Sequence, residues 1–215
     1  MESNKLLSKS FLWMCFGLLV TFLTGFGVAT NERMLENIFG GISFWIFIVL
    51  ELVVVIYLSF RITKMSPTTA KVCFLLYSFI SGLTFSSIFV YYELSSIIYI
   101  FLASSLIFGI MALIGYKTKA DLSELGFYLM VALFAVIIVT LINVIIGSDS
   151  LSIILCIICL LLFLGITAYD VQNIKSLENS DLPQDNLAIY GALQLYLDFI
   201  NIFIDLLRLF AENKD

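Results

Sequence analysis

The chain contains seven apolar stretches, each close to the roughly 20 residues that a helix needs to cross a bilayer. They run over Phe11–Ala29, Ile42–Phe60, Val72–Tyr91, Ile97–Tyr116, Phe127–Ile146, Leu151–Tyr169 and Leu187–Phe210. Backbone polar groups in lipid must be satisfied within the chain itself, so such stretches form helices. The separators are too short for a soluble domain. The sequence therefore predicts an all-α polytopic membrane protein, in which residues 1–215 form one domain of seven transmembrane helices.

Composition narrows the possible chemistry. The chain is 61% hydrophobic and 13% charged, far from a soluble domain, and it contains no histidine. That absence excludes His-based catalytic triads, most catalytic zinc sites and the imidazole proton switch. Any pH-dependent chemistry must then rely on carboxylates. A net charge of −5, with basic residues spread over loops, argues against a nucleic-acid partner. No cofactor is expected.

The basic residues predict the orientation in the membrane, because cytoplasmic loops carry an excess of Lys and Arg. Eight lie in the N-terminus and the second, fourth and sixth separators: Lys5, Lys9, Arg61, Lys64, Lys71, Lys117, Lys119 and Lys175. The other side holds three: Arg33, Arg208 and Lys214. We therefore expect a cytoplasmic N-terminus and a C-terminus outside. Short termini and loops favour a bacterial plasma membrane.

Few charged residues lie within the apolar stretches, and each costs about 2.5–3.5 kcal/mol at the bilayer centre on insertion scales. Asp198, Asn201, Asp205 and Arg208 follow one another at steps of three and four, so they share one face of the seventh helix. Such a face cannot stand against lipid. The seventh helix is therefore predicted to lie at the centre of the bundle.

The third helix carries a repeat of small residues. Ser78, Gly82 and Ser86 recur at a spacing of four and offer a face on which another helix can pack closely.

The expected depth of each charged residue in the membrane suggests which residues can pair with one another. Arg61 ends the second helix and Asp170 ends the sixth on the same predicted side, so a charge-assisted pair between them is geometrically allowed. Asp198 is left without a cation. Its carboxyl is expected to be neutral or to share a proton with a second carboxyl, for which Asp170 is the natural candidate.

Near the opposite side, Arg208 needs an anion. Glu51, within the second helix, or the neighbouring Asp205 can supply it.

Three segments carry a resemblance to a known family. Residues 168–175 (AYDVQNIK) and 195–208 (LYLDFINIFIDLLR) resemble the signature segments of the Bax inhibitor-1, or transmembrane Bax inhibitor motif, family. Residues 78–84 (SFISGLT) are similar to it as well. The resemblance spans all seven helices and is greatest to the bacterial YetJ-like branch. It implies a calcium-permeable leak channel with a central seventh helix and a pH-sensitive pair, Asp170 and Asp198.

The resemblance also implies roles for three other charged residues. Arg61 is expected to interact with the aspartate pair near the cytoplasmic end, and Glu51 and Arg208 are expected to pair nearer the outer face. Asp205 stands where the family is expected to have an uncharged polar residue, so it can compete for Arg208.

A mechanism follows from the chemistry of the aspartate pair. Calcium is a hard cation that takes oxygen ligands, so Asp170 and Asp198 are candidate transient ligands when ionised. When the two carboxyls share a proton, their hydrogen bond holds the sixth and seventh helices together and closes the path. Acidification should then reduce the leak. Calcium, protons and the bilayer are the expected partners, and a monomer is favoured.

Two other functions remain open. Two aspartates on neighbouring helices are also what an intramembrane aspartyl protease requires. However, Asp198 sits in Tyr196-Leu-Asp198-Phe199 rather than a Gly-x-Gly-Asp setting, and no later helix supplies a Pro-Ala-Leu element, so we do not expect an enzyme. The second alternative is a non-conducting membrane regulator in which the acids only fasten helices.

Overall fold

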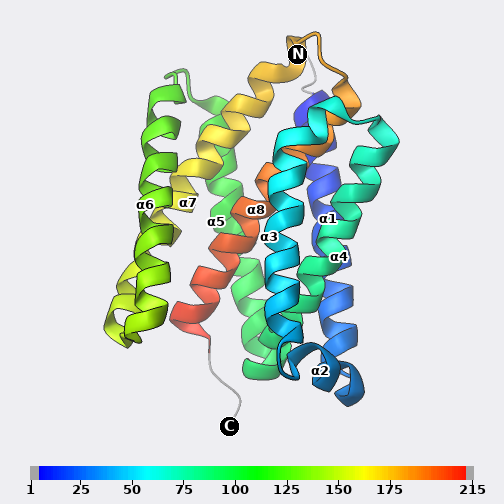
Figure 1. The fold of residues 1–215 in the computed structure, drawn as a ribbon. Helices are drawn as coiled ribbons and strands as arrows, with labels where there is room; N and C mark the ends of the chain where they lie inside the picture. Colours follow the sequence, from blue (N-terminus) through cyan, green and yellow to red (C-terminus); the bar gives the residue numbers. More distant parts are fainter. Residues whose placement is uncertain (1–4, 212–215) are drawn as a thin grey trace. The chain divides into compact units, whose positions relative to one another are not determined.

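The computed structural model describes residues 5–211, and this part of the chain is built from helices (Figure 1). The elements are α1 (Lys5–Ala29), α2 (Glu32–Phe39), α3 (Ser43–Arg61), the 3-10 turn η1 (Ile62–Lys64), α4 (Pro67–Tyr91), α5 (Leu94–Lys117), α6 (Ser123–Ile146), α7 (Asp149–Ser176), the 3-10 turn η2 (Leu177–Asn179) and α8 (Gln184–Phe210). Within residues 5–211, seven helices are long and apolar enough to cross a membrane: all except α2. The predicted all-α polytopic architecture is confirmed.

Most helices extend beyond the apolar stretches that predicted them. α4 begins at Pro67, after Ser66, whose hydroxyl caps the helix by accepting a hydrogen bond from the Thr69 N–H at 3.2 Å. α7 runs on past Tyr169 to Ser176, so Asp170 is not the end of its helix as predicted. Hydropathy marks the part of a helix in hydrocarbon, whereas the backbone stays helical through the interface, where polar side chains are tolerated.

The separator between the first two apolar stretches contains a short helix, which the apolar stretches did not predict. Residues 32–39 form α2, and Asn31 caps it by accepting a hydrogen bond from the Met34 N–H at 3.2 Å. Its apolar residues occupy positions 34, 35, 38 and 39, which is the spacing of an amphipathic helix. The high charge of this segment hid the pattern.

The described residues form two compact units. The first contains residues 5–94 and 177–196, and the second contains residues 95–176 and 197–211, so the two halves of α8 belong to different units. In the first unit α4 packs against both α1 and α3, and α2 contacts α1 and α3 (Figure 1). In the second unit α6 packs along α7. That residues 1–215 fold as one domain stays a prediction.

Small residues bring α1 and α4 together, as the spacing of Ser78, Gly82 and Ser86 predicted. A Cβ at Gly82 would lie 2.5 Å from Thr24 Cβ and 2.8 Å from the Thr21 carbonyl oxygen. The Thr21 hydroxyl donates to the Ser78 carbonyl oxygen at 2.9 Å. Close backbone approach with a hydroxyl bond across it is a common form of helix packing in membranes.

Helix α8 is the most buried of the seven candidate spans. Of its most apolar 18 residues 67% are buried, against 6% in α3 and α6. This agrees with the prediction that the last helix lies among the others.

At one end of the first unit, two lysines form salt bridges with the same aspartate. Lys9 of α1 and Lys71 of α4 both form salt bridges with Asp185 in the first turn of α8, at 3.3 and 3.1 Å. The three helices therefore begin at one end of this unit, as expected if all three start on the same side of the membrane. Lys214, which was counted in predicting the orientation, lies outside the described residues.

Candidate functional site

Asp170 and Asp198 come from neighbouring helices of the second unit. Asp170 lies on α7, six residues before the helix ends, and Asp198 lies fourteen residues into α8. Both side chains are buried, with 2% of each residue exposed. The two carboxyls are near enough to interact electrostatically. The structure thus brings together the two acids that the sequence singled out, while their role stays a prediction.

The surroundings of Asp198 leave one of its oxygens without a donor. Oδ2 of Asp198 is buried and has no hydrogen-bond partner among the described residues. The Thr167 hydroxyl, three residues before Asp170 on α7, interacts with the Asp198 side chain and donates to the Phe163 carbonyl oxygen at 2.7 Å. A buried carboxylate oxygen without a donor is costly. The site therefore favours a proton or a cation at this oxygen.

Aromatic rings join α5 to the turn of α8 that carries Asp198. The Phe199 ring, next to Asp198, meets Phe101 and Phe108 edge to face, with ring centroids 5.3 and 5.6 Å apart. These ring contacts hold this turn of α8 against α5.

The polar face of α8, formed by Asp198, Asn201, Asp205 and Arg208, runs from the buried Asp198 to the exposed Arg208 near the end of the helix. The Asn201 amide donates to the Leu197 carbonyl oxygen at 2.7 Å, within the helix. Asp205 is 7% exposed, and the Cys156 thiol of α7 lies 3.4 Å from both its Oδ1 and its carbonyl oxygen. Arg208 is exposed in the last turn and interacts electrostatically with Asp205. Asp205 is therefore buried against other helices, as predicted for this polar face, whereas Arg208 is exposed.

Glu51 and Arg61 belong to the first unit. The Thr84 hydroxyl of α4 donates to Glu51 Oε2 at 2.8 Å, and the Ser81 hydroxyl donates to Oε1. Arg61 is exposed at the end of α3. Their predicted partners, Arg208 and Asp170, belong to the second unit, so both pairings stay predictions.

Sequence reasoning missed the neutral groups around the acids. Thr167, Cys156, Ser81 and Thr84 carry no charge, and hydroxyls and thiols inside apolar stretches are common, so their residue types did not identify them as partners of the acids. Ser81 and Thr84 lie in the segment 78–84 that resembles the family, but that resemblance gave them no role. To identify these partners one must know which face each helix turns toward its neighbours, and the sequence does not provide that.

The oxygen ligands at Asp170 and Asp198 are suited to a cation that is bound transiently. Among residues 5–211, no group of three or more Cys, Asp or Glu side chains is arranged to hold a metal ion. Asp170 and Asp198 together offer carboxyl oxygens, which hard cations such as calcium prefer. Two carboxyls are few for calcium, which takes six to eight ligands, so water would complete the shell.

Seven long apolar helices with a buried pair of aspartates define a polytopic α-helical membrane protein. The model of the family described as "Inhibitor of apoptosis-promoting Bax1" matches residues 3–215. The chain is 39% identical over 208 residues to the inner membrane protein YbhL of Escherichia coli K12, covering 94% of this chain and 89% of that protein. It is 36% identical over 217 residues to an uncharacterised protein of Borreliella burgdorferi, covering 99% of this chain and 94% of that protein.

A third relative is an uncharacterised membrane protein of Streptococcus pyogenes serotype M1, 40% identical over 167 residues, covering 77% of this chain and 72% of that protein. The chain therefore belongs to the Bax inhibitor family, which confirms the resemblance found in its signature segments. It is a multi-pass membrane protein of that family, and the names of these relatives describe no enzymatic activity.

Proposed function

We propose that the protein is a pH-sensitive calcium leak channel whose gate is the pair Asp170 and Asp198. The observation that carries the proposal is the buried, interacting pair of carboxyls, one with an oxygen that has no hydrogen-bond donor among the described residues. Ionisable residues inside a membrane protein usually lie on ion or proton pathways. Membership of the Bax inhibitor family supports the same conclusion.

The gate works through one proton. When Asp170 and Asp198 share it, the hydrogen bond between them fastens α7 to α8 and excludes a cation from their oxygens. When the proton leaves, two negative charges in a medium of low dielectric constant repel each other and attract calcium. Lower pH favours the protonated pair, so the leak falls on acidification and rises towards neutral and higher pH.

Charged residues elsewhere adjust this gate in the proposal. Arg61 interacts with the pair from the predicted cytoplasmic end, and Glu51 pairs with Arg208 nearer the outer end. Asp205, which interacts with Arg208, weakens the hold of Glu51 on it.

The test is calcium entry into proteoliposomes that contain the purified protein and a calcium-sensitive dye, measured over a pH series. The wild-type flux should fall as the pH falls, whereas Asp198→Asn and Asp170→Asn should lose this dependence, because the one carboxyl that remains has no second carboxyl with which to share a proton. Asp149→Asn is the matched control, since Asp149 is an exposed acid in the first turn of the same helix as Asp170. It should keep the wild-type flux and pH response.

Two results would overturn the proposal. If the Asp198→Asn protein keeps the wild-type flux and pH response, the aspartate pair is not the gate. Purified protein that conducts no calcium at any pH would instead favour a non-conducting regulator, in which the acids only join helices.

For the orientation, we propose a bacterial plasma membrane location with the N-terminus in the cytoplasm and the C-terminus outside. The excess of basic residues on one side supports this orientation, and the salt bridges that join the starts of α1, α4 and α8 agree with these three ends lying on one side of the membrane. Fusions of a reporter that is active only in the cytoplasm, placed at each terminus, test it. Activity at the C-terminal fusion alone would reverse the assignment.

A further inference from the structure

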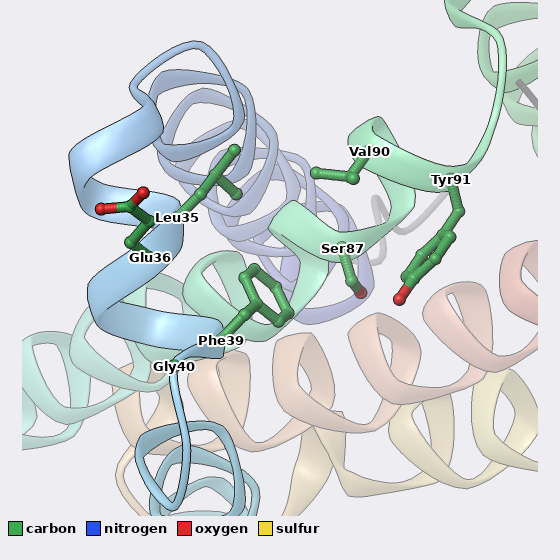
Figure 2. Close-up of a pocket in the computed structure, with 7 residues that line it drawn as sticks. All are labelled: Leu35, Glu36, Phe39, Gly40, Ser87, Val90 and Tyr91. Atoms are coloured by element: carbon green, nitrogen blue, oxygen red, sulfur yellow. The ribbon is translucent and has the colours of Figure 1, made fainter.

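A hollow of about 390 Å³ lies between α2 and the last turns of α4 (Figure 2). Its lining comes from the first unit only: Leu35, Glu36, Phe39, Gly40, Ser87, Val90 and Tyr91. It is separate from the aspartate pair, which belongs to the second unit, and no proposed role uses it.

The lining is apolar inside and polar at its edges. Figure 2 shows Leu35 and Phe39 pointing from α2 toward the side of α4 that carries Val90. Ser87 and Tyr91 add hydroxyls from the α4 side, whereas the Glu36 carboxylate points away from Val90. An apolar chain with a polar end matches this arrangement.

The position of the hollow determines which molecules can reach it. Ser87, Val90 and Tyr91 occupy the last turns of a helix that spans the membrane, so the hollow lies where acyl chains meet headgroups. The surface beside it exposes large apolar side chains, since Ile42 is 72% and Trp45 61% exposed. In a membrane such a surface is covered by lipid.

The charge of α2 narrows the choice of lipid. The helix carries Glu32 and Glu36 against one basic residue, Arg33. Glu36 lines the hollow and its side chain is exposed, so its negative charge disfavours an anionic headgroup nearby and favours an ammonium group. The Glu36 side chain is long, and rotation about its own bonds can bring the carboxylate to a headgroup at the edge.

We propose that this hollow binds a bilayer phospholipid whose headgroup carries a primary ammonium, with its acyl and glycerol part against Leu35, Phe39 and Val90 and its ammonium beside Glu36. The proposal does not depend on the calcium leak. It gives α2 a function that its position as a connector does not explain: it forms one wall of a lipid site.

The chain itself supplies a reporter for the test. It has two tryptophans, Trp13 and Trp45, so Trp13→Phe leaves one fluorophore. Trp45 lies near the hollow, because the Phe44 ring contacts both Trp45 and the lining residue Phe39, with ring centroids 6.2 and 5.1 Å apart. A quencher held in the hollow should therefore reduce Trp45 fluorescence.

The experiment compares two phospholipids brominated on the acyl chain near the glycerol, one with an ethanolamine and one with a glycerol headgroup, in bilayers that contain the Trp13→Phe protein. At equal mole fraction we expect the ethanolamine lipid to be bound about two- to fourfold more tightly, the range of an exposed charge pair. Glu36→Gln should abolish this preference. Glu32→Gln is the matched control, an acid of the same helix outside the lining, and should keep it.

A third variant tests the hollow rather than the charge. Val90→Phe places a larger side chain inside it and should remove the preference even with Glu36 present. Equal quenching by both lipids in the Trp13→Phe protein would overturn the proposal. So would a preference that survives Glu36→Gln, or one lost equally in Glu32→Gln, which would indicate a diffuse field and not a site.

Discussion

Replacing Gly82 with alanine tests the close approach of α1 and α4. The added Cβ would lie 2.5 Å from Thr24 Cβ and 2.8 Å from the Thr21 carbonyl oxygen. Carbon atoms normally pack about 3.5–4.0 Å apart, so the helices must separate locally by about 1 Å. Neither atom belongs to the free end of a side chain, so neither can rotate away. Separation also stretches the 2.9 Å bond from the Thr21 hydroxyl to the Ser78 carbonyl oxygen.

The magnitude follows from two opposing effects. Overpacking of a well-packed contact costs about 1–3 kcal/mol, and alanine gains up to about 1 kcal/mol over glycine in a helix interior. We expect Gly82→Ala to lower the free energy of unfolding by about 0–2 kcal/mol relative to the wild type, and by about 1–3 kcal/mol relative to a glycine-to-alanine change that makes no new contact. Gly27→Ala in α1 is the control, because a Cβ there meets nothing within 4 Å. It should leave stability unchanged or raise it by up to about 1 kcal/mol.

The assay is reversible unfolding in mixed micelles, in which SDS is titrated against a mild detergent and helicity is followed by circular dichroism. Both variants are measured beside the wild type. The reasoning is refuted if Gly82→Ala is as stable as Gly27→Ala, because the small-residue face would then not hold the helices together.

Two further variants test polar contacts of the first unit in the same assay. Tyr196→Phe removes the hydroxyl that lies 2.7 Å from the Thr21 hydroxyl, and it should cost about 0.5–1.5 kcal/mol; no loss would mean that this buried bond does not contribute. Asp185→Asn removes the salt bridges to Lys9 and Lys71, which are partly exposed, so it should cost less than about 1 kcal/mol. That cost should shrink near 1 M salt, where the Debye length is about 3 Å, and a cost independent of salt would contradict the ionic explanation.

Hydropathy located the spans well but their ends poorly. The seven apolar stretches coincide with long helices, except that Ile42 lies one residue before α3, yet α7 continues to Ser176 and α4 starts at Pro67. Burial of apolar groups in lipid decides where a helix crosses the membrane, whereas caps and backbone hydrogen bonds decide where it ends. For the same reason α2, which is too short and too charged to span a membrane, could not be recognised by the length of an apolar run.

The candidate site was predicted in part. Asp170 and Asp198 could be found because placing a carboxyl within or next to an apolar stretch costs free energy, and such residues usually have a function. Glu51 was found in the same way, but its hydrogen-bond donors Ser81 and Thr84 were not. A hydroxyl can satisfy itself on the carbonyl of its own helix, so its presence in the sequence does not show that it has another partner.

The sequence by itself determined the seven membrane-spanning helices, the family, and which few acids lie at membrane depth. These depend on local properties, since the transfer of each segment from water to lipid is a sum over its own residues. Only the tertiary structure decided that Cys156 faces Asp205, that α4 hydroxyls hold Glu51, and that α2 forms a wall of a hollow. Those contacts depend on how each helix is rotated and shifted along its neighbour, which is fixed by packing between segments far apart in the chain.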